Sequence, residues 1–224
     1  FGNLTPVIPF RSFPSGTEPI FQSLKAHAPL ALGQRVLVIA RTGNERRSFL
    51  RSLIGACDDK TVCMLLLIDS RPEDVTALRR EVSAEIISTT IDELPVRHVQ
   101  VVDMALERAR RVVEQGRDVV LMVDSITRLT RAIYATSARP APDLITSYQV
   151  RSLFASGRQL EEGGSLTLIA TAVTGEDPGG AGLIEELRSA ANAWVTLVDG
   201  EVDASRSAAR HSEQHPVGVP PRGC

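Results

Sequence analysis

The sequence has few cysteines and no excess of charge of either sign. Its cysteines, Cys57, Cys63 and Cys224, match neither a paired disulfide framework nor a metal-binding spacing. This scarcity favours a reducing, cytoplasmic setting. The four histidines are scattered along the chain, so no histidine-based metal site is predicted. The formal net charge of −2 gives no overall attraction to nucleic acid or to an anionic membrane, although a local RNA channel is compatible with it.

The sequence also lacks a long hydrophobic run. No apolar segment reaches the roughly 18–20 residues that span a bilayer, and no basic segment followed by an apolar one resembles a secretory leader. We therefore expect no association with a membrane. The 224 residues, 43% of them hydrophobic, are sufficient for one domain with a substantial core.

The distribution of proline divides the chain into three parts. Prolines punctuate residues 1–32, which are predicted to be an extended lead-in or connector packed on the domain. Residues 33–213 carry the periodic pattern of a folded domain. The periodicity fades from about Asp203, and residues 214–224 are predicted to be a loose tail.

Continuous apolar runs alternate with amphipathic segments in the central part. The runs predict strands at 36–40, 63–68, 85–89, 118–123, 165–173 and 194–198. The amphipathic segments predict helices at 46–56, 73–82, 94–115 and 147–160. This alternation is typical of an α/β fold with a parallel, doubly wound sheet, whose ligands bind at the carboxyl ends of the strands. Two strands end there in Asp69 and Asp124.

The segment after the first strand lies where a phosphate-binding loop, G-x-x-x-x-G-K-[ST], is expected. In that register Glu45 replaces the second glycine, Arg46 the lysine and Arg47 the hydroxyl residue that holds Mg²⁺. A carboxylate about 4 Å from a phosphate repels it by about 1 kcal/mol in water, and by several in a drier site. By itself the segment fits a surface turn equally well. The candidate nucleotide-binding residues are Thr42, Gly43, Asn44, Glu45, Arg46, Arg47 and Arg71.

Several longer blocks resemble the motor domain of bacterial transcription termination factor Rho. They are FGNLTP (1–6), GQR (33–35), LLLIDSRPEDV (65–75), RHVQVVDMALERARRVVEQGRDVVLMVDSITRLTRA (97–132) and EEGGSLTLIATAV (161–173). The resemblance extends from residue 1 to about 213. It implies a RecA-like phosphate-loop NTPase fold with a mainly parallel sheet flanked by helices. It also implies a hexameric ring that uses ATP and Mg²⁺ to move along RNA and acts on RNA polymerase.

The same resemblance assigns roles to individual residues. Asp124 matches the aspartate that organises Mg²⁺, and Arg71 matches the arginine beside the nucleotide. Ser70 replaces the catalytic glutamate, and a serine can neither polarise the attacking water as a carboxylate does nor accept its proton. Arg206, in the segment 203–210, resembles the arginine finger that a neighbouring subunit would receive. A solvated tail remains the alternative for that arginine.

The two segments that match the RNA-contacting loops of the family depart from its pattern. Residues 137–146 read SARPAPDLIT, and residues 174–180 read TGEDPGG. Neither contains a lysine, and acidic groups in the second would repel a phosphate backbone. The family's N-terminal RNA-binding domain is also expected to be absent. We therefore predict a weakened grip on RNA.

Three hypotheses follow from these substitutions. The first is a Rho-like motor domain with lost or strongly impaired ATP hydrolysis and RNA translocation. It would act as an assembly or regulatory protein, as a homo-oligomer or in association with Rho. The second is a divergent but active RNA-dependent ATPase of transcription termination, in which Arg46 replaces the lysine and Glu73 or Asp74 replaces the glutamate. The third is a decaying copy with no present role.

Overall fold

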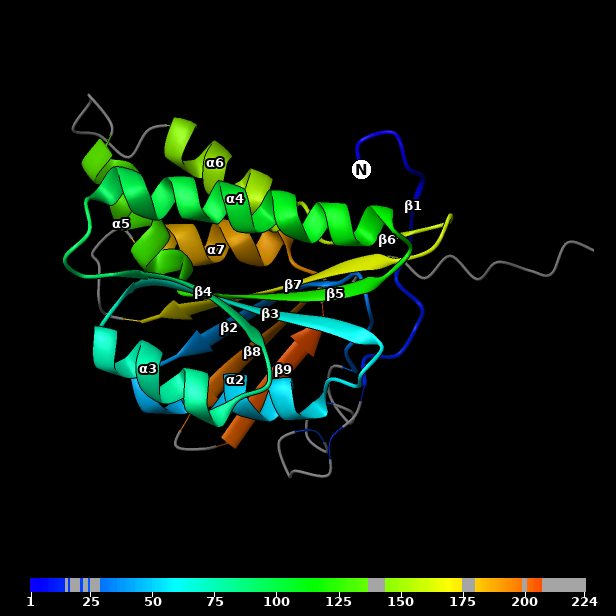
Figure 1. Cartoon of the computed structure of the whole chain (residues 1–224), viewed down its shortest axis with the longest axis horizontal. Coiled ribbons are helices and arrows are strands. Elements are labelled where there is room, and N and C mark those ends of the chain that lie inside the picture. The colour runs from blue at the N-terminus through cyan, green and yellow to red at the C-terminus, as the bar shows by residue number, and fades with distance from the viewer. Residues whose placement is uncertain are drawn as a thin grey trace, which may run out of the picture.

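A mainly parallel sheet covered by helices on both faces forms the fold (Figure 1). The computed structural model describes residues 1–14, 16, 21, 24, 29–136, 144–174, 180–198 and 201–206. Within these residues the sheet has nine strands. No helix in the described part of the chain is long and apolar enough to cross a bilayer.

Six neighbouring strands of the sheet are parallel. Their order is β4 (Glu85–Thr90), β3 (Thr61–Ser70), β5 (Asp118–Asp124), β7 (Ser165–Val173), β2 (Arg35–Ala40) and β8 (Ala193–Val198). The antiparallel additions are β9 (Glu201–Arg206) beside β8, β6 (Arg158–Leu160) beside β7, and β1 (Pro6–Val7) beside β6. Every residue of β7 is buried, which accounts for its uninterrupted apolar and small-residue sequence.

The helices form one layer on each face of the sheet (Figure 1). Helices α2 (Gly43–Ala56) and α3 (Pro72–Glu81) cover one face. Helices α4 (Pro95–Glu114), α5 (Ile126–Thr136), α6 (Leu144–Phe154) and α7 (Gly180–Ala190) cover the other. Each layer has its own apolar core, one containing Phe154 and the other Phe49. These cores fix the strand ends and helix starts that surround the candidate site.

The structure confirms the predicted fold class and all six predicted strands. It corrects the helix expected at 147–160, which ends at Phe154 and is followed by β6. A Cβ on Gly157 would lie 2.7 Å from Cγ of Arg35, so this close approach at the turn requires glycine. Although the periodicity of the sequence fades from about Asp203, the chain continues as strand β9 to Arg206. Helices α5 and α7 were not predicted.

The described part of the lead-in is attached to the domain by polar contacts. Arg11 donates two hydrogen bonds to the carboxylate of Asp118, at 2.8 and 2.5 Å. The backbone N–H of Thr5 donates to the two carboxylate oxygens of Glu162 at 2.9 and 3.0 Å. These contacts lie near β6, away from the carboxyl ends of the parallel strands. None of the described lead-in residues lines the pocket described next.

Candidate functional site

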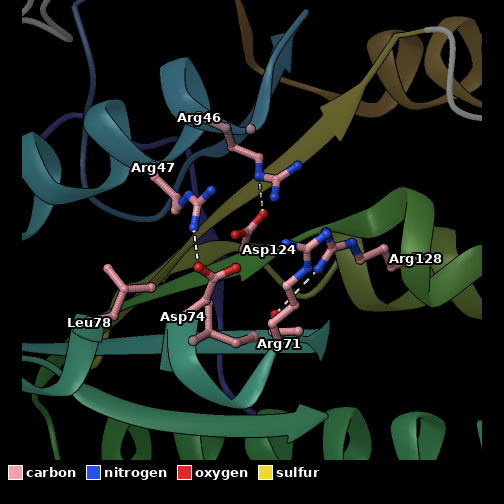
Figure 2. Close-up of a pocket in the computed structure, with 10 residues that line it drawn as sticks. Arg46, Arg47, Arg71, Asp74, Leu78, Asp124 and Arg128 are labelled. Atoms are coloured by element: carbon pink, nitrogen blue, oxygen red, sulfur yellow. Dashed lines mark hydrogen bonds and ion pairs between the residues drawn. The ribbon is translucent and has the colours of Figure 1, made fainter. Parts of the chain in front are cut away.

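A pocket of about 240 Å³ lies at the carboxyl ends of β3 and β5, beside the first turns of α2 and α3 (Figure 2). This is the place where a parallel α/β sheet is expected to bind its ligand. Its lining residues are Gly43, Arg46, Arg47, Leu67, Ser70, Arg71, Asp74, Leu78, Asp124 and Arg128. Six residues predicted from the sequence are thus brought together: Gly43, Arg46, Arg47, Ser70, Arg71 and Asp124. The predicted residues Thr42, Asn44 and Glu45 do not line the pocket.

Arg46 and Asp124 form an ion pair inside this pocket. Nε of Arg46 lies 2.5 Å from Oδ1 of Asp124, and the two side chains are only 6% and 4% exposed. The Nε–H group nevertheless makes no aligned hydrogen bond. Oδ1 of Asp124 accepts one at 2.9 Å from the hydroxyl of Thr171 on β7. The residue at the lysine position therefore neutralises the residue at the Mg²⁺ position.

A second ion pair joins α2 to α3. Nη1 of Arg47 donates to Oδ1 of Asp74 at 2.6 Å, and both side chains are about one-third exposed. Of the two carboxylates considered as replacements for the catalytic glutamate, Asp74 lines the pocket. Glu73 is exposed and does not line it. Asp74 is therefore the better placed of the two to replace the catalytic glutamate, but its charge is already balanced by that of Arg47.

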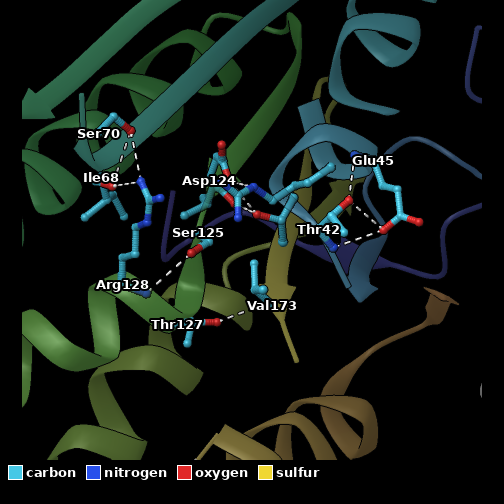
Figure 3. A network of polar contacts seen from close by, with 12 residues as sticks. Thr42, Glu45, Ile68, Ser70, Asp124, Ser125, Thr127, Arg128 and Val173 are labelled. Carbon is cyan, nitrogen blue, oxygen red and sulfur yellow. Dashed lines mark hydrogen bonds and ion pairs between the residues drawn. The ribbon is translucent and has the colours of Figure 1, made fainter. Parts of the chain in front are cut away.

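Glu45 closes the start of α2 through a capping box with Thr42 (Figure 3). The backbone N–H of Thr42 donates to the Glu45 carboxylate at 3.0 Å, and the backbone N–H of Glu45 donates to the Thr42 hydroxyl at 3.3 Å. Helix N-termini bind phosphate through such N–H groups. Here the chain's own side chains satisfy two of them. The carboxylate expected to repel phosphate is thus folded back onto the cap.

Ser70 ends β3 and is bound by an arginine that the sequence analysis did not single out. Nη1 of Arg128 donates to the Asp69 carbonyl oxygen at 2.8 Å, and lies 3.3 Å from that of Ile68 and 3.4 Å from Oγ of Ser70 (Figure 3). Arg128 stands on the first turn of α5, four residues after Asp124. If a helix had been predicted after β5, the spacing of four residues from Asp124 would have placed Arg128 on the first turn of that helix, beside the site.

Arg71 precedes α3 and points its charge into the pocket without a counter-ion. Its side chain is exposed, and it makes no hydrogen bond or ion pair with any described residue. Arg206 is the last residue of β9, and its side chain lies outside the described part of the structure. Residues 137–143 and 175–179, which carry most of the two expected RNA loops, also lie outside it. The arginine finger at Arg206 and the two RNA-contacting loops therefore stay predictions.

The charges of the pocket suit an anion better than a metal ion. Four arginines face two aspartates, and each aspartate is already paired with an arginine. Mg²⁺ requires oxygen ligands in a nearly octahedral arrangement. Asp124 has a guanidinium in contact with it, and Arg47 offers no oxygen at the hydroxyl position. The described residues therefore do not fit a bound Mg²⁺.

Comparison with known proteins agrees with this architecture. Residues 21–199 match the family model "ATP synthase alpha/beta family, nucleotide-binding domain". A solved ATPase from the type III secretion system of pathogenic bacteria superposes with a TM-score of 0.78 at 19% identity. That match covers 92% of this chain and 64% of the other, and it supports the fold alone.

Curated proteins named "Transcription termination factor Rho" are similar in sequence. The Bacillus subtilis protein is 38% identical over 185 residues, a match that covers 77% of this chain and 43% of that protein. The Mycobacterium leprae protein is 36% identical over 214 residues, with 88% and 34% covered. The Rhodopirellula baltica protein is 37% identical over 242 aligned positions, with 95% and 46% covered. The chain thus spans less than half the length of these relatives.

Proposed function

Because this chain belongs to the ATP synthase α/β family of nucleotide-binding domains and is similar to Rho, we propose that it is a Rho-type motor domain without effective ATP hydrolysis. It serves as an assembly or regulatory partner, within a ring of its own copies or beside an active Rho. Its connection to RNA and to RNA polymerase is through that ring. The proposal extends from the family to the individual residues of the pocket.

The observation that carries this proposal is the buried pair of Arg46 and Asp124. ATP with Mg²⁺ would have to separate the pair, because the metal needs the carboxylate and the phosphates need the cation. Breaking a buried ion pair by removing one partner costs about 3–5 kcal/mol. Binding of the nucleotide would have to supply that free energy before any catalysis. The pair therefore supports weak or absent binding of Mg²⁺-ATP.

Among the described residues, the pocket also has no carboxylate outside an ion pair that could activate water. Ser70 occupies the glutamate position, and its hydroxyl lies 3.4 Å from the guanidinium of Arg128. A general base must accept a proton from water, which a serine beside a cation does not do at neutral pH. Asp74 is the other carboxylate of the pocket, and it is already engaged in an ion pair with Arg47. The proposal therefore places the loss at the chemical step as well as at nucleotide binding.

The scaffold, in contrast, is retained. The six parallel strands are complete, and the two apolar cores on their faces are continuous. Retention of the fold together with loss of the loop chemistry is what a non-catalytic subunit requires.

The test combines one assay of activity with one of association. The purified chain is incubated with Mg²⁺-ATP and RNA, and phosphate release is measured. It is then mixed with the Bacillus subtilis Rho, and complexes are measured by native mass spectrometry while the ATPase rate of that Rho is followed. We expect no phosphate release from the chain alone, and a mixed complex or a changed Rho rate. Absence of self-association and of any complex with Rho would contradict the assembly role.

The active-ATPase alternative has one observation in its favour, the position of Asp74 in the pocket. Under this alternative, the chain releases phosphate in an RNA-dependent reaction, and this release is lost in the Asp74→Asn variant and retained in the Glu73→Gln variant. The two carboxylates are neighbours on α3, but only Asp74 lines the pocket, so they form a matched pair. Release of phosphate with this pattern would replace our proposal by the alternative.

A further inference from the structure

We propose that the pocket binds a compact phosphoryl oxyanion without a divalent metal, with arginines in place of the metal. The ligand is free phosphate or pyrophosphate, or the phosphate end of a nucleotide. This inference rests on the proposed function, because both assign Arg46 and Arg47 to the positions that a working site reserves for phosphate and metal contacts. It goes further by naming what the altered site binds.

The balance of charge around the pocket leaves a positive surplus. Arg46, Arg47, Arg71 and Arg128 line it together with Asp74 and Asp124, so its formal charge is two units positive. Each aspartate is paired with one of the two arginines on α2. The surplus therefore belongs to Arg71 and Arg128, which face the pocket from α3 and α5. A bound dianion would balance it.

Several guanidinium N–H groups remain available for a ligand. Nε of Arg46 is not one of them, because it is buried against Oδ1 of Asp124. All the hydrogen bonds that the Arg128 side chain makes to described residues use Nη1. Arg71 makes none with the described residues. Guanidinium groups bind phosphate in bidentate geometry, and such bonds are about twice as strong as those between neutral groups.

The start of α2 contributes little to this binding. The capping box occupies the N–H groups of Thr42 and Glu45, so two of the donors that could hold a phosphate at the helix N-terminus are taken. The available donors lie instead toward α3 and α5. The proposed anion therefore sits beside Arg71 and Arg128, displaced from the loop.

The size of the pocket limits the ligand. Its volume of about 240 Å³ is below the roughly 300–1,000 Å³ of pockets that enclose organic ligands. A phosphate or pyrophosphate group fits inside such a volume. The sugar and base of a nucleotide would have to lie outside it. Recognition is therefore expected to depend on phosphoryl oxygens and not on a base.

The experiment is a calorimetric titration of the full chain with pyrophosphate. One titration contains EDTA and the other contains excess Mg²⁺; ATP replaces pyrophosphate in a parallel pair. The variant is Arg71→Ala, which removes a side chain that has no partner among the described residues and so leaves the fold intact. Its matched control is Arg80→Ala, an exposed arginine on the same helix that does not line the pocket.

We expect pyrophosphate to bind in EDTA and to bind more weakly when Mg²⁺ competes for it. Arg71→Ala should weaken binding by at least about tenfold, the usual effect of losing a hydrogen bond to a charged group, and Arg80→Ala should not. Equal binding of ATP in EDTA would identify the nucleotide's phosphate end as a source of the anion; binding of pyrophosphate alone would identify a free anion. Both support the proposal.

Three results would overturn it: no binding of pyrophosphate in EDTA, binding that requires Mg²⁺, or equal affinities of the two variants. Binding of ATP without pyrophosphate would also do so, because it would show recognition of the nucleoside. These results are separate from those that test the proposed function. A chain that binds no pyrophosphate and also hydrolyses no ATP would contradict only this inference, whereas hydrolysis of Mg²⁺-ATP would contradict the proposed function.

Discussion

Nε of Arg46 lies 2.5 Å from Oδ1 of Asp124, and this contact joins the first turn of α2 to the end of β5 inside the protein. In a working phosphate loop the two positions serve a nucleotide and its metal. Here they neutralise each other, and the hydroxyl of Thr171 donates a hydrogen bond to the same oxygen of Asp124. In a working site these two positions would bind and release phosphate and metal in each catalytic cycle. In this protein they form a buried ion pair that is part of the folded structure.

The pair is expected to matter for stability. Replacing Arg46 by alanine leaves Asp124 buried and uncompensated, so the free energy of unfolding should fall by about 3–5 kcal/mol. The matched control is Arg51→Ala on the same helix, because Arg51 forms an exposed ion pair with Glu81. That substitution should cost at most about 1 kcal/mol. Urea unfolding measures the free energy of unfolding of both variants. Equal decreases would show that the buried ion pair contributes no more to stability than the exposed one.

The capping box gives a smaller and separate prediction. Thr42→Ala removes the hydroxyl that accepts the Glu45 N–H at the start of α2, and should lower the free energy of unfolding by about 0.5–2 kcal/mol. Ser48→Ala, an exposed hydroxyl residue inside the same helix, serves as the control and should change stability little. Thermal unfolding followed by circular dichroism compares them. A control as damaging as Thr42→Ala would contradict the role of the cap.

Much of this arrangement could be predicted from the sequence, for identifiable reasons. Strand β7 was predicted at its observed bounds because its residues are buried on both faces and form one apolar run. Asp124 and Ser70 were predicted at the carboxyl ends of two strands, and they are the last residues of β5 and β3. Predicting the fold class required only the alternation of apolar runs and amphipathic segments, which can be recognised in the local sequence.

What could not be predicted depended on tertiary contacts. Arg46 and Asp124 were predicted to have separate roles, because nothing in the local pattern indicates that a guanidinium will reach a carboxylate on another element. Arg128 was not singled out because only Ser125 separates β5 from α5, so no loop in the sequence marks the start of the helix. Strand β9 lacks an apolar run because it is paired through its backbone at the edge of the sheet.

Two neighbouring cysteines should react at different rates. The thiol of Cys63 donates a hydrogen bond to Cys57 and so holds the pKa of Cys57 below its usual value. The same hydrogen bond, together with burial, raises the pKa of Cys63. Cys57 is half-buried and Cys63 is buried. Since the thiolate is the reactive form, iodoacetamide should modify Cys57 first, with a rate that increases as the pH rises toward its pKa.

Peptide mass spectrometry distinguishes the cysteines during this reaction. In the Cys63→Ala variant the hydrogen-bond donor is gone, so the pKa of Cys57 should rise and its modification near neutral pH should slow. Modification of Cys63 before Cys57 in the unaltered chain would contradict the assignment. Unchanged reactivity of Cys57 in the variant would show that Cys63 does not set its pKa.

The loop substitutions should be partly reversible, because the scaffold around them is intact. The combined substitution Glu45→Gly, Arg46→Lys and Arg47→Thr removes the capping carboxylate and supplies a hydroxyl for Mg²⁺. It also replaces a planar guanidinium by a slender ammonium that reaches phosphate oxygens. We expect this variant to bind ATP in a Mg²⁺-dependent manner, and we expect the unaltered chain not to do so. Calorimetry with and without EDTA measures the difference.

Hydrolysis should require one further change. Adding Ser70→Glu to the loop variant restores a carboxylate at the end of β3, where it can accept a proton from water, and we expect RNA-stimulated phosphate release only from this combination. Ser70→Glu alone is the control: it supplies the base without a site for the nucleotide and should release no phosphate. Circular dichroism confirms that each variant is folded. A folded loop variant that binds no Mg²⁺-ATP would show that the defect extends beyond Glu45, Arg46 and Arg47, into the scaffold itself.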